Sequence, residues 1–526
     1  MTRSSHLGPR TSALRHGRPN IVVVMTDQQR ADLARREGYA LDTTPFLDDL
    51  ARSGAWFDHA YTPIPVCGPA RVSLLTGRYP SAHHVRENRG TDHAVYAHDL
   101  FDVVRGEGYA SALVGKNHSH LDPERLDFVA RYMHNGGLEA ARSPEERAFD
   151  QWLADLHHRV GLTPTPFPLE CQAPYRIVSQ AESWIRSLDG APFCLWLSFP
   201  EPHNPYQVPE PYFSMFPPET LPPLATDEAA LSGQSFPWRY LRQIGEAAHP
   251  NYGEVIPRAR ANYLGMLRLL DDQIRRFVTF LDNAGLRENT LLVFLSDHGD
   301  FVGEYGLMRK GAEMPELLMR VPLFFAGPGV RASAAPHPAF VSLVDVLPTL
   351  CEALGVSMPP GVQGRSLWPL LTGGDYPMAE FASVYGEQGI GGLHLTADDV
   401  VEDWPGLTIT PERRAFDELN ACTQSGNLRM VRKGDWKLLL DMHGHGQLYD
   451  LADDPFELDN RFDDPSRVET RADLLAELVA WMLRAQDSLP IPVNGYRRKT
   501  DPRNYWTPYR ETTASGPDEQ REEHAP

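Results

Sequence analysis

The stretch NIVVVMTDQQR (residues 20–30) is an unbroken apolar run, mostly β-branched, that leads directly into Asp27. Such a run is typical of a strand buried on both faces of a parallel sheet. The stretch TLLVFLSDHGD (residues 290–300) repeats the pattern and leads into Asp297. Because strand-like and helix-like segments alternate along the chain around both stretches, we predict an α/β fold with a large, mostly parallel mixed sheet between helices.

Polar side chains follow both of these predicted strands. Since ligands bind at the carboxyl ends of the strands in open α/β sheets, we expect Asp27, Gln28, Asp297 and His298 to lie together. Their carboxylate and amide oxygens, with one imidazole, suit a divalent cation: Ca²⁺ first, with Mg²⁺ or Mn²⁺ as alternatives. Either aspartate alone could instead cap the helix that follows it. The similar context of the pair favours a metal site.

The size and charge of the chain limit its possible partners. It has 526 residues, 42% of them hydrophobic, and a formal net charge of −20 at pH 7. This length predicts two or three packed units. The negative charge argues against nucleic acid or a membrane surface as partner. The longest apolar runs are of strand length, too short to cross a bilayer.

Cysteine usage points to a reducing compartment. The chain has five cysteines, an odd number at wide spacings, which is neither a disulfide framework nor a set of zinc-binding pairs. The basic, polar first residues lack the apolar segment of a secretory signal peptide. We therefore expect a cytoplasmic protein.

Shifts in composition and periodicity divide the chain into four parts. Within the part that covers residues 19–375, we expect residues 123–190 to be mainly helical and residues 217–257 to form a surface insertion. Within the part that covers residues 376–490, residues 428–451 predict an antiparallel meander, and residues 471–486 predict a helix packed on it. The four parts are a disordered leader (1–18), a catalytic domain (19–375), a smaller α+β domain (376–490) and a partly disordered tail (491–526).

A single cysteine precedes an apolar helix in the segment CGPARVSLLTG (residues 67–77). Pro69 suits the first turn of a helix and Gly77 its end. Cys67 is then expected at a helix N-terminus, where the free N–H groups and the macrodipole favour anions. It could be a small packing residue or a thiolate nucleophile with a histidine base. Neither explanation accounts for the spacing of Cys67, Pro69 and Arg71.

This segment closely resembles the signature of type I sulfatases, in which the cysteine is oxidised to formylglycine. Four other segments are similar to further segments of that family in the same order, and the resemblance covers roughly residues 19–485. They are GYASALVGKNH (108–118), SFPEPHNPYQVP (198–209), SDHGDFVGEYGLMRK (296–310) and QLYDLADDPFELDN (447–460). The resemblance implies an alkaline phosphatase-like fold with a smaller C-terminal antiparallel sheet and a helix. It also implies maturation of Cys67 by a formylglycine-generating enzyme.

The resemblance further implies a role for each matching residue. Cys67, as formylglycine hydrate, would attack the sulfur of a small anionic sulfate ester while contacting the metal. Arg71 and Lys116 would hold this nucleophile and the anionic oxygens. Lys310 and His203 would assist the leaving group. The proton of the second hydroxyl would pass to His118, which restores the aldehyde.

Two residues depart from the pattern of many sulfatases, and they leave the substrate open. Gln28 stands where many members have a second aspartate, and His298 where some have asparagine. Family members that hydrolyse phosphonate monoesters or phosphodiesters show a similar set, so such a hydrolase is the main alternative. A non-catalytic anion- or sugar-binding relative and a metal-dependent phosphatase with a thiol nucleophile are further ones. Asn88, with Arg86, is a candidate for substrate binding or simply a surface loop. We also expect the chain to assemble into homo-oligomers.

Overall fold

The computed structural model describes residues 18–138, 141–249, 251–390, 394–399, 422–485 and 503–506. The expected leader (1–18) and tail (491–526) lie outside the described residues, except for residue 18 and residues 503–506. Within the described part, no helix combines the length and the apolar character that crossing a membrane requires.

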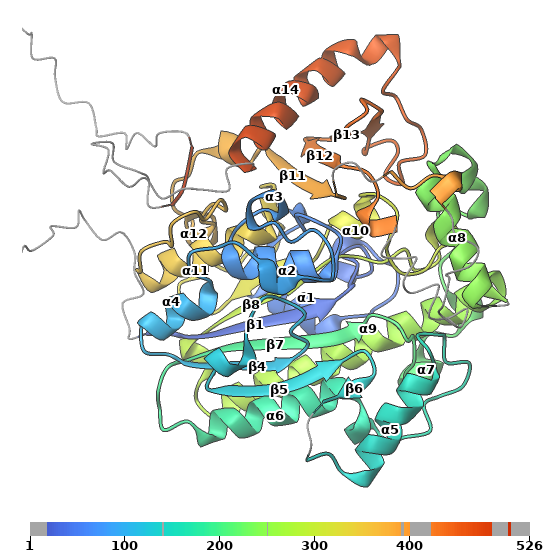
Figure 1. Ribbon diagram of the computed structural model, residues 1–526. Helices are drawn as coiled ribbons and strands as arrows, with labels where there is room; N and C mark the ends of the chain where they lie inside the picture. Colours follow the sequence, from blue (N-terminus) through green and yellow to red (C-terminus); the bar gives the residue numbers. More distant parts are fainter. Residues whose placement is uncertain are drawn as a thin grey trace, which may run out of the picture.

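An eight-stranded mixed sheet forms the centre of the molecule (Figure 1). Its strands, in spatial order, are β2 (Ala55–Phe57), β9 (Leu323–Ala326), β8 (Thr290–Ser296), β1 (Asn20–Asp27), β7 (Phe193–Pro202), β4 (Ala110–Gly115), β5 (Phe128–Met133) and β6 (Gly136–Gly137). The strands from β8 to β5 run parallel, whereas β9, β2 and β6 each pair antiparallel with a neighbour. The predicted large, mostly parallel mixed sheet is confirmed.

Helices cover both faces of this sheet, because side chains of β1 alternate between two hydrophobic cores. Ile21, Val23 and Met25 belong to one core, and Val22 and Val24 to the other. The first face carries α2 (Cys67–Thr76), α4 (Leu100–Gly106), α11 (Val346–Leu354) and α12 (Trp368–Thr372), and the second α1 (Pro45–Arg52), α6 (Ala173–Ser187) and α9 (Tyr252–Asn283).

Shorter elements connect these layers. They are β3 (Ala60–Tyr61) and β10 (Val341–Ser342), which pair with each other, and the helices α3 (Pro80–His83), α5 (Pro144–Asp155), α7 (Tyr212–Met215), α8 (Phe236–Ala248) and α10 (Glu316–Met319).

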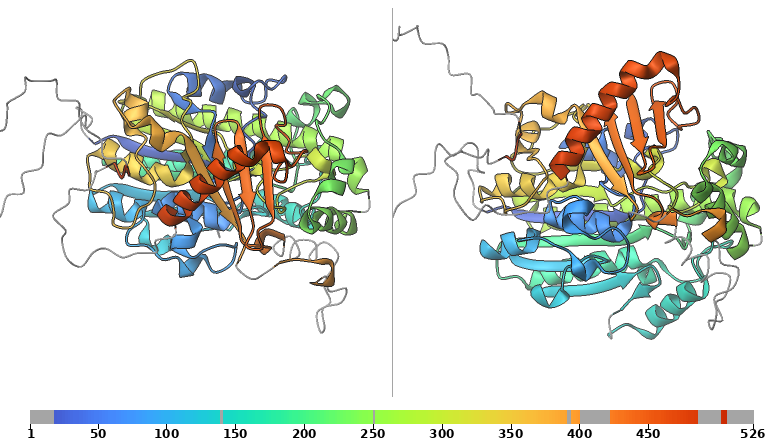
Figure 2. Two further views of the ribbon diagram at one scale, coloured as in Figure 1. Left: turned by 90° about the horizontal axis from the view of Figure 1, so that it is seen from above. Right: turned by 45° about the horizontal axis from the view of Figure 1, so that its top comes forward.

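A second, four-stranded antiparallel sheet follows, with one helix across it (Figure 2). It consists of β11 (Ser383–Gln388), β12 (Leu428–Lys433), β13 (Trp436–Leu440), β14 (Gly446–Asp450) and α14 (Val468–Ala485). Trp481 of α14 stacks on Tyr385 of β11 at a ring distance of 6.0 Å. The expected antiparallel meander with a helix packed on it is confirmed.

Two segments contain regular elements that the sequence did not predict. Residues 123–190 contain the helices α5 and α6, as expected, but also β5 and β6, which extend the central sheet. Residues 217–257, expected to be a surface insertion, contain α8 and the beginning of α9. Trp238 of α8 is buried against Phe301. Pro257 lies inside the first turns of α9, where it obscures the helical periodicity of the sequence.

Candidate active site and metal centre

Four neighbouring parallel strands, β8, β1, β7 and β4, deliver polar residues to one edge of the central sheet. Asp297 follows β8, Asp27 ends β1, His203 follows β7 and Lys116 follows β4. The register pairs Thr26 with Ser296, so the two aspartates come to adjacent positions. All four side chains are buried. The strand ends therefore bring together the acidic and basic residues that the sequence analysis singled out.

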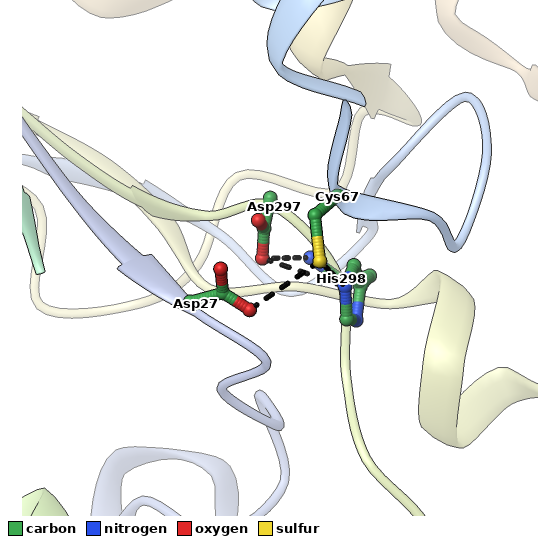
Figure 3. Close-up of side chains that lie close together, drawn as sticks. All are labelled: Asp27, Cys67, Asp297 and His298. Carbon is green, nitrogen blue, oxygen red and sulfur yellow. Dashed lines mark hydrogen bonds and ion pairs between the residues drawn. The ribbon is translucent and has the colours of Figure 1, made fainter. Parts of the chain in front are cut away.

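Cys67 reaches this edge from the N-terminus of α2. Val66 precedes the helix in extended conformation, and Gly77 ends it in the left-handed region. The Cys67 Sγ lies 3.1 Å from Nε2 of His298 and 3.6 Å from Oδ1 of Asp27. Figure 3 shows these side chains and Asp297 pointing toward one another. The cysteine is thus part of the acidic cluster rather than a packing residue of α2.

Arg71, one helical turn further along α2, lies beneath the two aspartates. Its Nε donates to Oδ2 of Asp297 at 2.9 Å, and its second terminal nitrogen donates to Oδ2 of Asp27 at 3.1 Å. The other terminal nitrogen donates to the Ser198 hydroxyl at 2.8 Å and to the Lys116 carbonyl at 2.9 Å. Arg71 therefore fixes the two carboxylates, and one oxygen of each remains on the side of Cys67.

These residues fit a divalent cation. One donor atom from each of Asp27, Cys67, Asp297 and His298 lies within 4.8 Å of the others. Nδ1 of His298 donates to the Gly299 carbonyl at 2.8 Å, which leaves the Nε2 lone pair facing the cluster. Such a backbone acceptor is the usual way in which a metal-binding histidine is oriented. Two carboxylates and an imidazole suit metals of this class.

Gln28 borders this group and adopts a backbone φ of 72°. Its Oε1 accepts a hydrogen bond from Lys310 at 3.2 Å, and its Nε2 donates to Asp300. Lys310 also donates to the Cys67 Sγ at 3.0 Å. Gln28 and Lys310 thus lie at one side of the cluster, with the ammonium between the amide and the sulfur.

Charge is unevenly distributed in the site. Burial raises the pKa of Asp27, but Lys116, His203 and Arg71 outweigh it, so this pKa lies well below its usual value. Burial and the charge of Asp27 raise the pKa of Asp297. A bound divalent cation would stabilise the charged forms of both carboxylates.

The Cys67 thiol is strongly acidified. Burial and Asp27 raise its pKa, but Lys116, Lys310 and His298 together have the larger, opposite effect. The pKa of the thiol therefore lies well below that of an ordinary cysteine. The pKa of His203 lies well below its usual value, chiefly because of burial. The site therefore places the neutral imidazole of His203 near two buried ammonium groups, Lys116 and Lys310, which favour anions.

His118 and Asn88 lie beside the N-terminus of α2. Nε2 of His118 is 3.2 Å from the Asn88 carbonyl oxygen, and the Asn88 side chain accepts a hydrogen bond from the Gly68 N–H at 3.0 Å. Asn88 thus contacts Gly68, the neighbour of Cys67, whereas His118 contacts Asn88. Arg86 donates to the Gly389 carbonyl at 3.4 Å, so it links this loop to the end of β11.

Two residues that hold the site together were not expected from the sequence. His134, between β5 and β6, lies 3.0 Å from the Lys116 Nζ, and its ring stacks on His203. Asp300 accepts hydrogen bonds from the Tyr206 hydroxyl at 2.6 Å and from the Arg309 N–H at 2.8 Å, next to Lys310. Asp300 stands three residues after Asp297, so its position near a candidate metal ligand was a signal. His134 offered none, since its position depends on the pairing of β5 with β4.

A family model described as "Sulfatase" matches residues 19–356 of the chain. An arylsulfatase of Clostridium perfringens is 28% identical over 500 residues, which cover 89% of this chain and 95% of that protein. A multifunctional alkaline phosphatase superfamily protein, PehA of Trinickia caryophylli, is 29% identical over 521 residues, which cover 89% and 96% of the two chains.

Among solved structures, the phosphonate monoester hydrolase of Agrobacterium radiobacter superposes with a TM-score of 0.71 at 25% identity. The match covers 89% of this chain and 96% of that one. The alkaline phosphatase-like fold expected from the sequence is therefore confirmed, including its smaller antiparallel sheet.

Proposed function

Because the chain belongs to the sulfatase family, we propose that it is a sulfuric ester hydrolase that cleaves a small sulfate ester through a formylglycine formed from Cys67. One observation carries this proposal: the Cys67 Sγ lies between the Lys310 ammonium and the metal-site donors Asp27 and His298. The sulfur marks the position that the hydroxyl oxygens of formylglycine hydrate would take after maturation. These oxygens would then lie between the Lys310 ammonium and the metal. The arylsulfatase relative supports the choice of a sulfate ester.

We propose that Asp27, Asp297, His298 and the matured Cys67 hold the divalent metal, with Gln28 beside them. Ca²⁺ is the first candidate, and Mg²⁺ or Mn²⁺ are alternatives. The metal would supply Lewis acidity that lowers the pKa of the attacking hydroxyl. Formylglycine hydrate would supply two hydroxyls, of which one attacks sulfur and the other expels sulfate.

The surrounding side chains have complementary tasks in this proposal. Arg71 fixes the carboxylates of Asp27 and Asp297, since all of its nitrogens are engaged below the site. Lys116 and Lys310 attract the anionic ester. Protonated ammonium groups stabilise negative charge that develops in the transition state.

Leaving-group assistance is assigned to Lys310 and His203. Burial lowers the pKa of Lys310, but the opposite effect of Cys67 and Asp27 is larger. The pKa of Lys310 is therefore raised, and the ammonium stays charged. Nδ1 of His203 donates to the Asn204 carbonyl at 2.6 Å, which leaves Nε2 for the substrate. An arriving anion would favour protonation of that nitrogen. His118 is proposed to take up the proton of the second hydroxyl, and Asn88 to bind the substrate.

A phosphonate monoester or phosphodiester hydrolase that uses the same residues is the second candidate. Gln28, a neutral amide, occupies the position where many sulfatases carry a second aspartate. The similar fold of a phosphonate monoester hydrolase supports this candidate. The name of the relative PehA, "multifunctional", agrees with activity on more than one ester class.

A substrate panel tests the proposed function. Matured protein is assayed with 4-nitrophenyl sulfate, 4-nitrophenyl phenylphosphonate and bis(4-nitrophenyl) phosphate, which share one leaving group. We expect the sulfate to have the highest kcat/KM. A higher kcat/KM for either phosphorus ester would transfer the assignment to the second candidate. The Cys67→Ala variant, which lacks the nucleophile, controls for contaminating hydrolases.

The setting of the enzyme is part of the same proposal. We propose a catalytic domain over residues 19–375, a smaller α+β domain over residues 376–490, maturation by a formylglycine-generating enzyme, and assembly into homo-oligomers. All five cysteines lie in the described part of the chain, are buried and form no disulfide, which supports the proposed reducing, cytoplasmic location. The site residues from Asp27 to Lys310 all belong to residues 19–375, which supports the division into domains.

A further inference from the structure

His134 lies at the end of β5, away from every segment that resembles the sulfatase pattern. We propose that His134 is a positioning residue that orients Lys116 through a hydrogen bond and His203 through ring stacking. This inference rests on the proposed function, because it concerns two groups that the proposal places against the ester. It adds to the site a residue that neither the motifs nor the family match assigns.

The position of His134 follows from strand pairing. β5 runs parallel to β4, and Gly115 pairs with Arg131. Lys116 is one residue beyond Gly115, and His134 is three residues beyond Arg131, so both leave the sheet at the same edge. The antiparallel pairing of β5 with β6, which includes Met133 with Gly136, fixes the turn that contains His134.

The contact with Lys116 limits the directions of the ammonium hydrogens. A lysine ammonium has three N–H donors and no acceptor. One donates to Oδ2 of Asp27 and a second to Nε2 of His134, at 3.0 Å. A single N–H therefore remains for the substrate. Without the acceptor on His134, two hydrogens would be uncommitted and the ammonium would be held by Asp27 alone.

The same contact determines the protonation state of His134. Since lysine can only donate, Nε2 must carry a lone pair, and the proton of the neutral ring lies on Nδ1. This Nδ1 is buried and, among the described residues, has no hydrogen-bond partner. A buried polar group without a partner costs about 1–3 kcal/mol of stability. An apolar side chain would avoid this cost. The hydrogen bond from Lys116 to Nε2 therefore explains why an imidazole stands at this position.

The second contact concerns His203. The two imidazole rings are stacked, with 3.6 Å between their centroids and 16° between their planes. His203 is also held by the hydrogen bond from its Nδ1 to the Asn204 carbonyl. One face and one edge of His203 are thus fixed, and Nε2 has a defined direction. His134 therefore links the residue that binds the anion to the residue that assists the leaving group.

Two substitutions separate the two contacts. His134→Phe retains a ring that can stack on His203 but removes the acceptor for Lys116. His134→Gln retains an acceptor oxygen but removes the ring. Each variant is assayed with 4-nitrophenyl sulfate and with phenyl sulfate, whose leaving group is poorer. Mass spectrometry of the peptide that contains Cys67 normalises each rate to the formylglycine content.

We expect His134→Phe to lower kcat by about 10–100-fold for both esters, since a misplaced charge costs rate whatever the leaving group. We expect His134→Gln to lower kcat more for phenyl sulfate than for 4-nitrophenyl sulfate, because the poorer leaving group depends more on assistance. His158→Phe is the matched control. His158 packs near the same rings, at 6.1 Å from His134, and hydrogen-bonds the Asn204 carbonyl at 3.4 Å. It should stay within about 3-fold of the wild type, below the range expected for acid–base groups.

The proposal is overturned if both His134 variants retain kcat within the range of the control. It is also overturned if both lower the two rates equally and in step with lost thermal stability, since that would be a structural role. Nitrogen NMR of histidine-labelled protein gives a readout that needs no substrate. The His134 signal should report a protonated Nδ1 and an Nε2 that shifts in Lys116→Met. An unchanged signal would refute the contact, whereas a wild type inactive on every ester would refute only the proposed function.

Discussion

Arg71 donates a hydrogen bond of 2.9 Å to Asp297, and both side chains are completely buried. The same guanidinium donates to Asp27, on the neighbouring strand. Taking away this cation would leave the buried Asp297 carboxylate without its arginine partner and Asp27 with Lys116 alone. We predict that Arg71→Ala lowers the free energy of unfolding by about 3–5 kcal/mol, as for other broken buried ion pairs.

Urea denaturation of unconverted protein measures this effect independently of maturation. Arg52→Ala is the matched control, because Arg52 forms an exposed pair with Asp49 at 3.3 Å. Such surface pairs contribute at most about 1 kcal/mol. Equal losses in the two variants would mean that Arg71 does not hold the carboxylates.

Asp297→Asn tests the metal site, since it removes a charge and keeps the shape of the side chain. A divalent cation gains most of its affinity from charged ligands. We predict at least a 10-fold weaker metal affinity, by analogy with changes around other metal sites. Metal content after dialysis and titration calorimetry measure it. Asp32→Asn, which changes an aspartate paired with Arg30 instead, should bind metal like the wild type.

Cys67→Ser tests why a dihydroxy nucleophile is needed. A serine hydroxyl can attack sulfur once, but it offers no second hydroxyl to expel the sulfate. We predict a stoichiometric release of 4-nitrophenol from 4-nitrophenyl sulfate, followed by arrest, with a sulfated peptide in the mass spectrum. Continued turnover of the purified variant would contradict this role of Cys67.

Asp271 provides a pH-dependent test of the fold. Its carboxylate accepts the Phe46 and Leu47 N–H groups at the N-terminus of α1, at 3.1 and 2.8 Å. Burial nevertheless raises the pKa of Asp271 to about 7. Below about pH 4, the ordinary pKa of aspartate, the group is neutral in both the folded and the unfolded chain. As the pH rises toward 7, the unfolded chain ionises first, so the folded state loses stability.

Asp271→Asn cannot ionise, so its stability relative to the wild type should increase between about pH 4 and pH 7 and then level off. Urea denaturation at a series of pH values measures the difference. A constant difference across this range would show that the pKa of Asp271 is not raised.

Asn504 anchors residues 503–506 to the segment between α11 and α12. Its side chain donates to the Val362 and Gly364 carbonyls at 2.9 and 2.8 Å, and its φ is 63°. We predict that Asn504→Ala destabilises the protein by about 2–4 kcal/mol, from two lost hydrogen bonds and the left-handed backbone. Asn504→Gly should cost about 1 kcal/mol less, since glycine tolerates this backbone. Thermal unfolding of the two variants checks the order, and equal losses would exclude the backbone contribution.

The candidate metal site was predictable because the position of each of its residues follows from the sequence immediately around it. Asp27 and Asp297 each come directly after a buried strand, and parallel strands end at one edge. The position of Cys67 at a helix N-terminus was predictable from Pro69 and Gly77, and its role was expected from the resemblance of residues 67–77 to the sulfatase signature. These features depend on a few consecutive residues, so the sequence shows them.

The rest of the site depends on contacts between distant segments. His134 meets Lys116 because β5 pairs with β4, a pairing hidden in a segment that we expected to be mainly helical. Arg71 was expected to face the substrate, whereas its nitrogens bind Asp27 and Asp297 from below. The direction in which a buried side chain points is decided by its neighbours in space, which periodicity and motifs do not reveal.

The most direct test of the account is the mass of the tryptic peptide Ser53–Arg71 from protein produced together with a formylglycine-generating enzyme. The account predicts that Cys67 carries an aldehyde, which resists thiol alkylation and reacts with a hydrazide, and that sulfatase activity rises with the converted fraction. An unmodified Cys67 thiol in protein that still hydrolyses sulfate esters at full rate would contradict it.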